Sequence, residues 1–250
     1  LERFAADFES INELRKPKKI KQDLGKVAVV GSGPAGLSVA GDVAKLGYEV
    51  TVFEGQSEPG GVLLFGIPEF RLSKAVVRRE IARLEGLGVK FVCNTFIGQD
   101  KTLDDLFAEG YDSIFIGTGT HIPQDVRMEN DEVPGVFQAM YLLTNVQLVE
   151  NGELDENQIP VKKGDRVIII GGGNVAMDAA RTCVRLGCEA VTVAYRRSQE
   201  QMPALLSEYE EARAEGVQFQ WFASPVGVEG TDKVEGFKYE VMALNEDGAG

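Results

Sequence analysis

The chain has few of the side chains that acid–base and metal enzymes depend on. Its 250 residues include one histidine, His121, and three cysteines. With one histidine, neither a Ser–His–Asp triad nor a histidine-based metal site can be assembled from this chain. Cys93, Cys183 and Cys188 form no Cys-x-x-Cys pair. We therefore expect buried, inert thiols, no metal ligand, no iron–sulfur site and no redox-active disulfide.

Long apolar runs and an excess of positive charge are also missing. No apolar stretch approaches the roughly 18 residues of a membrane span, and the first residues lack the layout of a signal peptide. The 26 basic residues are outnumbered by 39 acidic ones, which gives a net charge of −13. This balance argues against nucleic acid or an anionic membrane as a partner. We expect a cytoplasmic protein, in which the basic residues 15–21 form a solvated linker or, alternatively, a docking patch for an acidic partner.

Glycine, by contrast, is abundant, with 29 residues. Two glycine-rich segments each follow an apolar run directly and lie 140 positions apart. The first is Gly-Ser-Gly-Pro-Ala-Gly at 31–36, after residues 26–30, and the second is Gly-Gly-Gly-Asn-Val-Ala at 171–176, after residues 167–170. A strand, a G-x-G-x-x-G/A turn and a helix in this order are typical of a dinucleotide-binding site.

The remaining sequence alternates strand and helix patterns, which predicts parallel sheets with helical crossovers. We expect an α/β fold with two Rossmann-like dinucleotide-binding domains. Residues 1–24 form a helix and basic linker, 25–120 the first domain and 121–250 the second. Strands are expected at 26–30, 49–53, 89–93, 112–116, 166–170, 190–195 and 217–221, helices at 34–46, 73–87, 103–108, 139–150, 174–186 and 203–215, and two antiparallel strands at 224–228 and 233–242.

Each glycine of the first segment has an expected task. Gly31 allows the tight turn out of the strand, Gly33 lets backbone N–H groups approach a pyrophosphate, and Gly36 lets the helix pack close to the strand. The phosphate lies at the positive helix end, which begins with Pro34 and Ala35. Proline suits that position because it has no N–H to lose.

A carboxylate follows this segment at the right distance. Glu54 ends the second strand, 23 residues after Gly31. It is able to accept both hydrogen bonds of an adenosine ribose diol and would repel a 2′-phosphate, so the site should take FAD or NAD. Glycines in two further segments favour FAD, because backbone without side chains can approach a ligand there: residues 58–63 and the Gly-Thr-Gly turn that contains Gly119.

The second segment has arginines where the first has its carboxylate. Gly171, Gly173 and Ala176 repeat the glycine pattern, with alanine at the packing position. Arg196 lies 25 residues after Gly171 and is followed by Arg197. Two guanidinium groups suit a 2′-phosphate, which indicates NADP(H), whereas the alternative interpretation is a pair of solvated arginines at a strand end.

These segments resemble one family of flavoproteins. The order Val-Val-Gly-Ser-Gly-Pro-Ala-Gly, Val-Phe-Glu, Gly-Ile-Pro-Glu-Phe-Arg-Leu, Gly-Thr-Gly, Gly-Gly-Gly-Asn-Val-Ala-Met-Asp and Tyr-Arg-Arg-Ser is similar to that of the small (β) subunits of NADPH-dependent glutamate synthase. The segment Gly66–Leu72 is its most specific part. The same module occurs in NADH-dependent ferredoxin:NADP oxidoreductase and in dihydropyrimidine dehydrogenase, and the motifs do not separate these three enzymes.

The resemblance implies an adrenodoxin-reductase-like pair of domains, with an NADP domain inserted in an FAD domain. NADPH would reduce FAD, and electrons would leave singly through iron–sulfur clusters outside this chain to a partner such as the glutamate synthase large subunit. By the same resemblance, two residues would lie near the flavin and six would hold NADP(H). These are Gly61 and Arg71 for FAD, Gly172, Gly173, Asn174 and Val175 at the NADP pyrophosphate, and Arg196 and Arg197 at its 2′-phosphate.

The family also has a cysteine-rich domain before this region and a Gly-Asp segment after it that contacts the flavin. The chain begins after the first of these and ends before the second, so we expect a fragment in which FAD binding is weakened or lost. A non-catalytic nucleotide-binding or docking piece is therefore an alternative. A disulfide reductase of the same fold is a third, and the missing Cys-x-x-Cys argues against it.

Overall fold

The computed structural model describes residues 1–12, 20–120 and 126–243. His121, most of the expected basic linker and the last residues lie outside these ranges. The chain divides into two compact units. The first consists of Leu1–Leu64 and Glu69–His121, and the second of Phe65–Pro68 and Ile122–Gly250.

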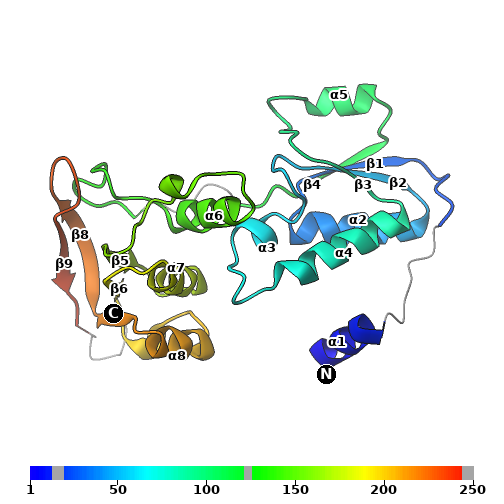
Figure 1. Ribbon diagram of the computed structural model, residues 1–250. Coiled ribbons are helices and arrows are strands. Elements are labelled where there is room, and N and C mark those ends of the chain that lie inside the picture. The colour runs from blue at the N-terminus through cyan, green and yellow to red at the C-terminus, as the bar shows by residue number, and fades with distance from the viewer. Residues whose placement is uncertain (13–19, 121–125, 244–250) are drawn as a thin grey trace. The chain divides into compact units, whose positions relative to one another are not determined.

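A four-stranded parallel sheet forms the centre of the first unit. Its strand order is β3-β2-β1-β4, and each pairing is parallel, with Val27 of β1 between Val50 and Ser113. Figure 1 shows α2 and α4 on one face of this sheet and α5 on the other. The elements are α1 (Glu2–Asn12), β1 (Lys26–Val30), α2 (Pro34–Leu46), β2 (Glu49–Phe53), α3 (Val62–Phe65), α4 (Lys74–Leu87), β3 (Lys90–Val92), α5 (Leu103–Ala108) and β4 (Ser113–Ile116).

Successive residues of the central strand serve two cores, because strand side chains alternate between the faces of a sheet. Val29 packs in a cluster with Ala40 and Ala44 of α2, whereas Ala28 and Val30 pack in another with Leu106 of α5. Both clusters are fully or almost fully buried. The apolar residues Val27 to Val30 are thus covered on both sides, as the sequence predicts, whereas Lys26 at the start of the strand is exposed.

The second unit has a three-stranded parallel sheet, of order β5-β6-β7, and a separate antiparallel hairpin of β8 and β9. Helix α7 lies between α6 and α8 (Figure 1), and its Met177, Ala180 and Cys183 form the core with strand residues such as Val193. The elements are α6 (Ala139–Glu150), η1 (Glu156–Gln158), β5 (Arg166–Ile170), α7 (Asn174–Arg185), β6 (Ala190–Tyr195), η2 (Gln199–Gln201), α8 (Leu206–Ala214), β7 (Gln218–Trp221), β8 (Ala223–Glu229) and β9 (Gly236–Val241).

The predicted α/β fold is confirmed, and most elements have the predicted limits. Strands β1, β2, β5 and β6 and helices α2, α5 and α6 begin and end at the predicted residues. The largest shifts are in β9, which begins at Gly236 and not at Lys233, and in α8, which begins at Leu206 and not at Pro203. The backbone N–H of Ala204 bonds to the Gly172 carbonyl, and that of Leu205 bonds to the Asn174 side chain. These bonds hold residues 204 and 205 against the second glycine loop, so that α8 begins only after them.

Candidate dinucleotide sites

The turn between β1 and α2 requires glycine at two positions. Gly31 has φ +93°, and a Cβ atom there would lie 2.6 Å from the Gly117 carbonyl oxygen. A Cβ atom at Gly36 would lie 1.9 Å from the carbonyl oxygen of Gly31. The first glycine therefore makes the turn, and the third lets α2 pack on it. These are the tasks that the sequence predicts for them.

Gly33 has a different environment, because no atom of another residue lies within 4 Å of the position of its missing Cβ. It is the N-cap of α2, with extended backbone and no side-chain cap, and Pro34 follows at the first helical position. Pro34 and Ala35 are exposed. By comparison, α5 begins with a complete Thr102–Asp105 capping box. The open, uncapped amino end of α2 suits an anion such as a pyrophosphate.

Glu54 lies at the carboxyl end of β2, where its side chain is buried and 8% exposed. Its Oε2 accepts the backbone N–H of Ser32 at 3.0 Å and also the Ser32 hydroxyl. Its Oε1 accepts the backbone N–H of Gln56 at 2.9 Å. The carboxylate is therefore held against the glycine loop before any ligand binds. The sequence analysis missed Ser32, whose only signal is its place between the first two glycines.

The second glycine-rich segment of this unit packs on the first. Gly60 donates its N–H to the Ser32 hydroxyl oxygen at 2.8 Å, and the missing Cβ of Gly61 would lie 2.9 Å from the Cα of Gly33. The structure thus brings Gly61 to the fingerprint loop, as its assignment to the FAD site requires. Gly119 has φ +73° and open space around it.

Arg71 lies half-buried in the turn before α4. Helix α4 begins with a buried lysine, Lys74, whose ammonium group donates to the Leu63 carbonyl oxygen at 2.9 Å. The Lys74 backbone N–H donates to Glu69 at 2.8 Å. These bonds fix the turn to the end of α3, and the assignment of Arg71 to the flavin stays a prediction.

The turn between β5 and α7 repeats the geometry of the first. Gly171 has φ +129°, and Gly173 is an extended N-cap without a side-chain cap. The position of the missing Cβ of Gly173 is again open, whereas that of Gly171 is 3.9 Å from the Cβ of Ala176. This spacing is an ordinary contact, and Ala176, at the position that corresponds to Gly36, is buried.

Gly172 is required by an aromatic neighbour. A Cβ atom at this position would lie 2.8 Å from the ring of Tyr195, the last residue of β6. The Tyr195 hydroxyl donates to the Gln201 carbonyl at 3.0 Å, and the Gly172 carbonyl accepts the N–H of Ala204 at 3.0 Å. Tyr195 therefore packs between the glycine loop and the segment that follows the arginine pair.

Asn174 and Val175 begin α7. The Asn174 side-chain oxygen accepts the Leu205 N–H at 3.0 Å, so this side chain holds the 198–205 segment in place. Its contribution to a pyrophosphate would come from the backbone N–H at the helix end. Val175 is 46% exposed, as expected for a residue at the open end of the helix.

The arginine pair follows β6 at the carboxyl end of the parallel sheet. Arg196 is exposed and Arg197 half-buried, and the Arg197 carbonyl accepts the N–H of Phe222 after β7. Neither guanidinium forms an ion pair with a carboxylate within the described part of the chain. Both are therefore available to an anionic group at this edge.

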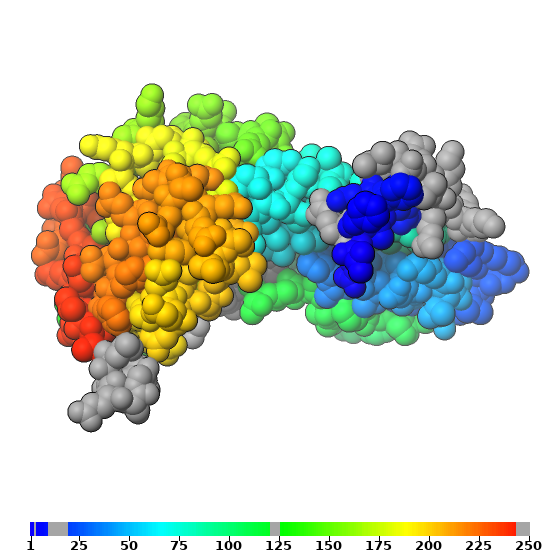
Figure 2. Space-filling model, turned by 90° about the horizontal axis from the view of Figure 1, so that it is seen from below, coloured from blue at the N-terminus to red at the C-terminus, as the bar shows by residue number. Residues whose placement is uncertain are grey.

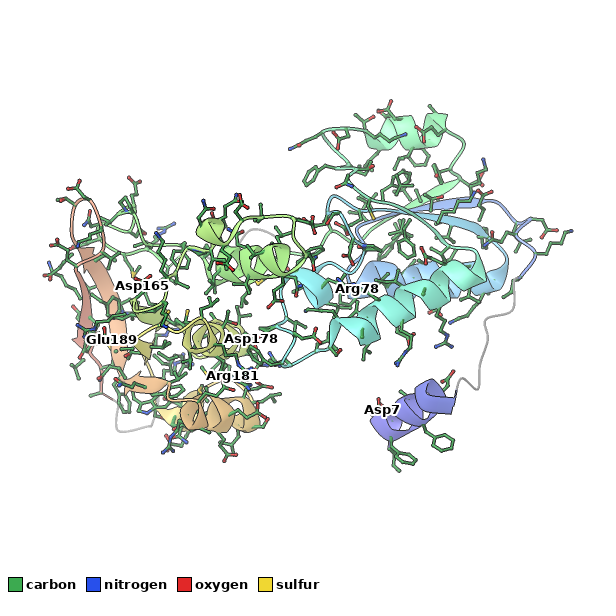
Figure 3. The ribbon with its side chains drawn as sticks, viewed as in Figure 1. Asp7, Arg78, Asp165, Asp178, Arg181 and Glu189 are labelled. Carbon is green, nitrogen blue, oxygen red and sulfur yellow. The ribbon has the colours of Figure 1, made fainter. Side chains whose placement is uncertain are left out.

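Another arginine of this unit has a structural task that the sequence analysis missed. Arg181 extends from α7 toward α8 (Figure 3), and its side chain is only 5% exposed. It pairs with Glu208 at 3.3 Å, Glu211 at 2.6 Å and Glu215 at 2.7 Å. Burial would raise the pKa of Glu215, but hydrogen bonds from Arg185 and Arg181 outweigh it and hold that pKa below the ordinary value.

The cysteines are free thiols, as the sequence predicts, but only Cys183 is fully buried. Burial raises the pKa of Cys183 to about 12. Cys93 and Cys188 are half-buried, and burial raises their pKa values as well. Over residues 1–12, 20–120 and 126–243, no three His, Cys, Asp or Glu side chains gather as a metal site, and no helix is long and apolar enough to cross a membrane.

Comparison with known proteins places the chain in a family. Residues 25–249 match the model of the pyridine nucleotide-disulphide oxidoreductase family. The chain is 41% identical over 234 residues to the small chain of NADPH glutamate synthase of Escherichia coli, which covers 92% of this chain and 49% of that protein. It is 36% identical over 233 residues to the NAD-dependent dihydropyrimidine dehydrogenase subunit PreT of the same organism, covering 92% and 53% respectively.

The fold has a solved counterpart in FprA of Mycobacterium tuberculosis, determined in complex with NADPH. The TM-score is 0.75 at 20% identity, and the match covers 90% of this chain and 65% of that one. The chain spans about half the length of the curated relatives. The resemblance to the glutamate synthase small chains is confirmed, and the chain belongs to the pyridine nucleotide-disulphide oxidoreductase family.

Proposed function

We propose that this chain is the dinucleotide-binding region of an NADPH-oxidising flavoprotein of the glutamate synthase small-chain type. The first unit holds FAD, and the second holds NADP(H), in a protein of the cytoplasm. When bound, FAD would supply the redox chemistry, hydride uptake from NADPH and one-electron release, and the electrons would pass through iron–sulfur clusters outside the chain to a partner subunit. Relatives that are themselves named as enzyme subunits support a partner of this kind.

The observation that carries the proposal is the difference between two otherwise equivalent sites. Each glycine loop is followed by a helix whose amino end is open, has no side-chain cap and therefore suits a pyrophosphate. Beyond it, the first site has the buried carboxylate of Glu54, and the second has Arg196 and Arg197 without carboxylate partners in the described structure. A carboxylate accepts ribose hydroxyls and repels a 2′-phosphate, whereas paired guanidinium groups bind one.

The residues of this chain are expected to bind and orient the two cofactors, through the backbone at the glycines and through side chains elsewhere. Gly31 and Gly36 shape the first loop, Glu54 receives the adenosine ribose, and Gly61 and Arg71 approach the flavin. In the second unit, Gly172 and Gly173 are expected at the pyrophosphate: Gly173 leaves the approach open, and Gly172 makes room for the Tyr195 ring. The side chains of Tyr195 and Asn174 hold the 198–205 segment against that loop.

The alternatives differ in cofactor preference and in turnover. The NAD-dependent relative PreT makes an NADH-using enzyme of the dihydropyrimidine dehydrogenase type the second candidate, and a ferredoxin:NADP oxidoreductase shares the same motifs. A piece that binds nucleotides without turnover is the third. Anaerobic mixing of the chain with FAD and NADPH tests turnover: the visible absorbance of bound flavin is expected to bleach, and its persistence would favour the non-catalytic piece.

The Arg196→Glu/Arg197→Glu double variant tests the cofactor preference. Its dissociation constants for NADPH and NADH are expected to converge, with at least about a tenfold loss of NADPH preference, because charge-assisted hydrogen bonds contribute about 1.5–3 kcal/mol. The matched control is Arg166→Glu, an exposed arginine that begins β5 at the opposite end of the same sheet. Full NADPH selectivity in the double variant would show that the 2′-phosphate does not bind at this pair.

A further inference from the structure

Ser32 connects three segments of the first site. It lies between Gly31 and Gly33, and the glycine pattern itself requires no particular side chain at position 32. The residue is completely buried, with 0% exposure. Its N–H and hydroxyl bind Glu54 after β2, and its hydroxyl oxygen accepts the N–H of Gly60. One small side chain therefore joins the fingerprint loop, the ribose carboxylate and the second glycine-rich segment.

The direction of these bonds is fixed by the donors present. The backbone N–H of Gly60 can only donate, so the Ser32 oxygen accepts it at 2.8 Å. A serine hydroxyl has a single proton, and a carboxylate that is ionised can only accept. The hydroxyl proton of Ser32 therefore points to Oε2 of Glu54. The chain of donors runs from Gly60 through Ser32 to Glu54.

This arrangement uses most of the acceptor capacity of the carboxylate. An ionised carboxylate has about four acceptor positions, two on each oxygen. Ser32 fills both positions of Oε2 with its N–H and its hydroxyl, and Gln56 fills one position of Oε1. One position on Oε1 stays open among the described contacts of Glu54. The low exposure of the side chain, 8%, agrees with a single open approach.

We propose that Ser32 is a positioning residue that saturates one oxygen of Glu54 and restricts the carboxylate to one hydroxyl of the adenosine ribose. Only one of the two ribose hydroxyls then contributes to FAD binding, which narrows the expectation that Glu54 accepts both. The inference rests on the proposed function, because it requires an adenine dinucleotide in the first site.

The test compares FAD with analogues that lack the 2′- or the 3′-hydroxyl of the adenosine ribose. Binding to the full chain is followed through flavin fluorescence, because NADP(H), the proposed ligand of the second unit, contains no flavin and does not contribute to this signal. In the unchanged protein, one analogue is expected to bind about tenfold more weakly than FAD or worse, since hydrogen bonds to charged groups contribute about 1.5–3 kcal/mol. The other analogue is expected to bind like FAD.

Two variants then separate positioning from structure. Ser32→Ala frees one of the two acceptor positions of Oε2, because the backbone N–H of residue 32 still donates to that oxygen. A second ribose hydroxyl can then bind there, so the difference between the two analogues is expected to shrink severalfold, while the loosened carboxylate binds FAD itself more weakly. Ser38→Ala is the matched control, because Ser38 is an exposed serine on α2, the helix that follows the loop of Ser32, and this variant should keep the pattern of the unchanged protein.

Three outcomes would overturn the inference. Equal losses for the two analogues in the unchanged protein would show that Glu54 binds both hydroxyls, and this result needs no variant to fold. If the Ser32→Ala protein bound FAD and both analogues more weakly by the same factor, the difference between the analogues would be unchanged. Ser32 would then have a structural role alone. Absence of FAD binding to the unchanged protein would instead reject the proposed function, and the inference with it.

Discussion

At the scale of single residues, glycines of one fingerprint have separable tasks. The missing Cβ of Gly36 would collide with backbone, at 1.9 Å from the Gly31 carbonyl oxygen, whereas that of Gly33 would meet nothing within 4 Å. Gly33 also has φ −67°, a value that any residue adopts. Packing within the protein therefore requires glycine at position 36. At position 33 the protein has room for a side chain, so we attribute the glycine there to the approach of a ligand.

We predict that alanine at Gly36 affects mainly stability and alanine at Gly33 mainly FAD binding. Gly36→Ala should lower the free energy of unfolding by about 1–3 kcal/mol or more, because backbone must move to admit the methyl group. Gly33→Ala should lower it by less than about 1 kcal/mol yet weaken FAD binding, since the methyl group occupies the open pyrophosphate approach. Urea unfolding and FAD titration of both variants measure these effects. Equal stability losses would contradict the assignment.

Sequence reasoning identified which residues surround the second loop but not what their side chains do. Asn174 is expected at the pyrophosphate, which stays a prediction, and its side chain also accepts the Leu205 N–H. No sequence pattern assigns a role to Tyr195, although its ring leaves no room for a side chain at Gly172. Both contacts join residues about 20 to 30 positions apart, and no local pattern encodes such pairings.

At the scale of elements, the predictable parts are those whose limits are set locally. Strand β1 has four successive apolar residues after Lys26 and ends before a glycine, and α2 begins at a proline and is followed by a glycine in the left-handed conformation. The four-residue helix α3 was missed because it is too short for a periodic pattern. The start of α8 was misjudged because distant hydrogen bonds determine it.

Helix α8 lies on the surface of the second unit (Figure 2) and is attached to α7 through the buried Arg181. Its C-cap residue Glu215 accepts hydrogen bonds from Arg181 and Arg185, each at 2.7 Å. The pKa of Glu215 is held below its ordinary value of 4.5. A carboxylate with a lowered pKa in the folded state stabilises that state above its unfolded pKa, and the stabilisation is lost as the pH falls through the folded value.

We therefore predict that Glu215→Gln removes part of the acid sensitivity of the second unit. At neutral pH the variant should be less stable by about 2 kcal/mol, because charge-assisted bonds are lost. Below the ordinary glutamate pKa of 4.5 the difference should decline. Unfolding followed by fluorescence as a function of pH measures it. Glu210→Gln, on the exposed side of the same helix, should show no such convergence, and a constant deficit in Glu215→Gln would contradict the explanation.

At the scale of the whole molecule, the chain contains two units with separate hydrophobic cores. The clusters around Val29 and Val30 belong to the first unit, and the cluster around Met177 belongs to the second. Each unit also contains one complete glycine loop and the charged residues that follow it. Folding and ligand binding can therefore be measured unit by unit.

The single tryptophan makes this separation measurable. Trp221 ends β7, and its ring lies 5.2 Å from that of Phe219 and 6.4 Å from that of Tyr195. Because Tyr195 precedes the arginine pair, tryptophan fluorescence reports the second unit near its proposed 2′-phosphate site. Circular dichroism reports the helices of both units.

We predict that thermal unfolding of the chain is not two-state and that the two cofactors shift different transitions. NADP⁺ at about 100 times its dissociation constant adds about 2.7 kcal/mol to the state that binds it, which should raise the tryptophan transition by about 10 °C for a unit of this size. FAD should raise the transition seen by circular dichroism but not by tryptophan. The Arg196→Glu/Arg197→Glu variant should lose only the NADP⁺ shift. A single transition that either cofactor raises equally for both probes would mean that the two units bind and unfold as one, and the assignment of one cofactor to each unit would lose its support.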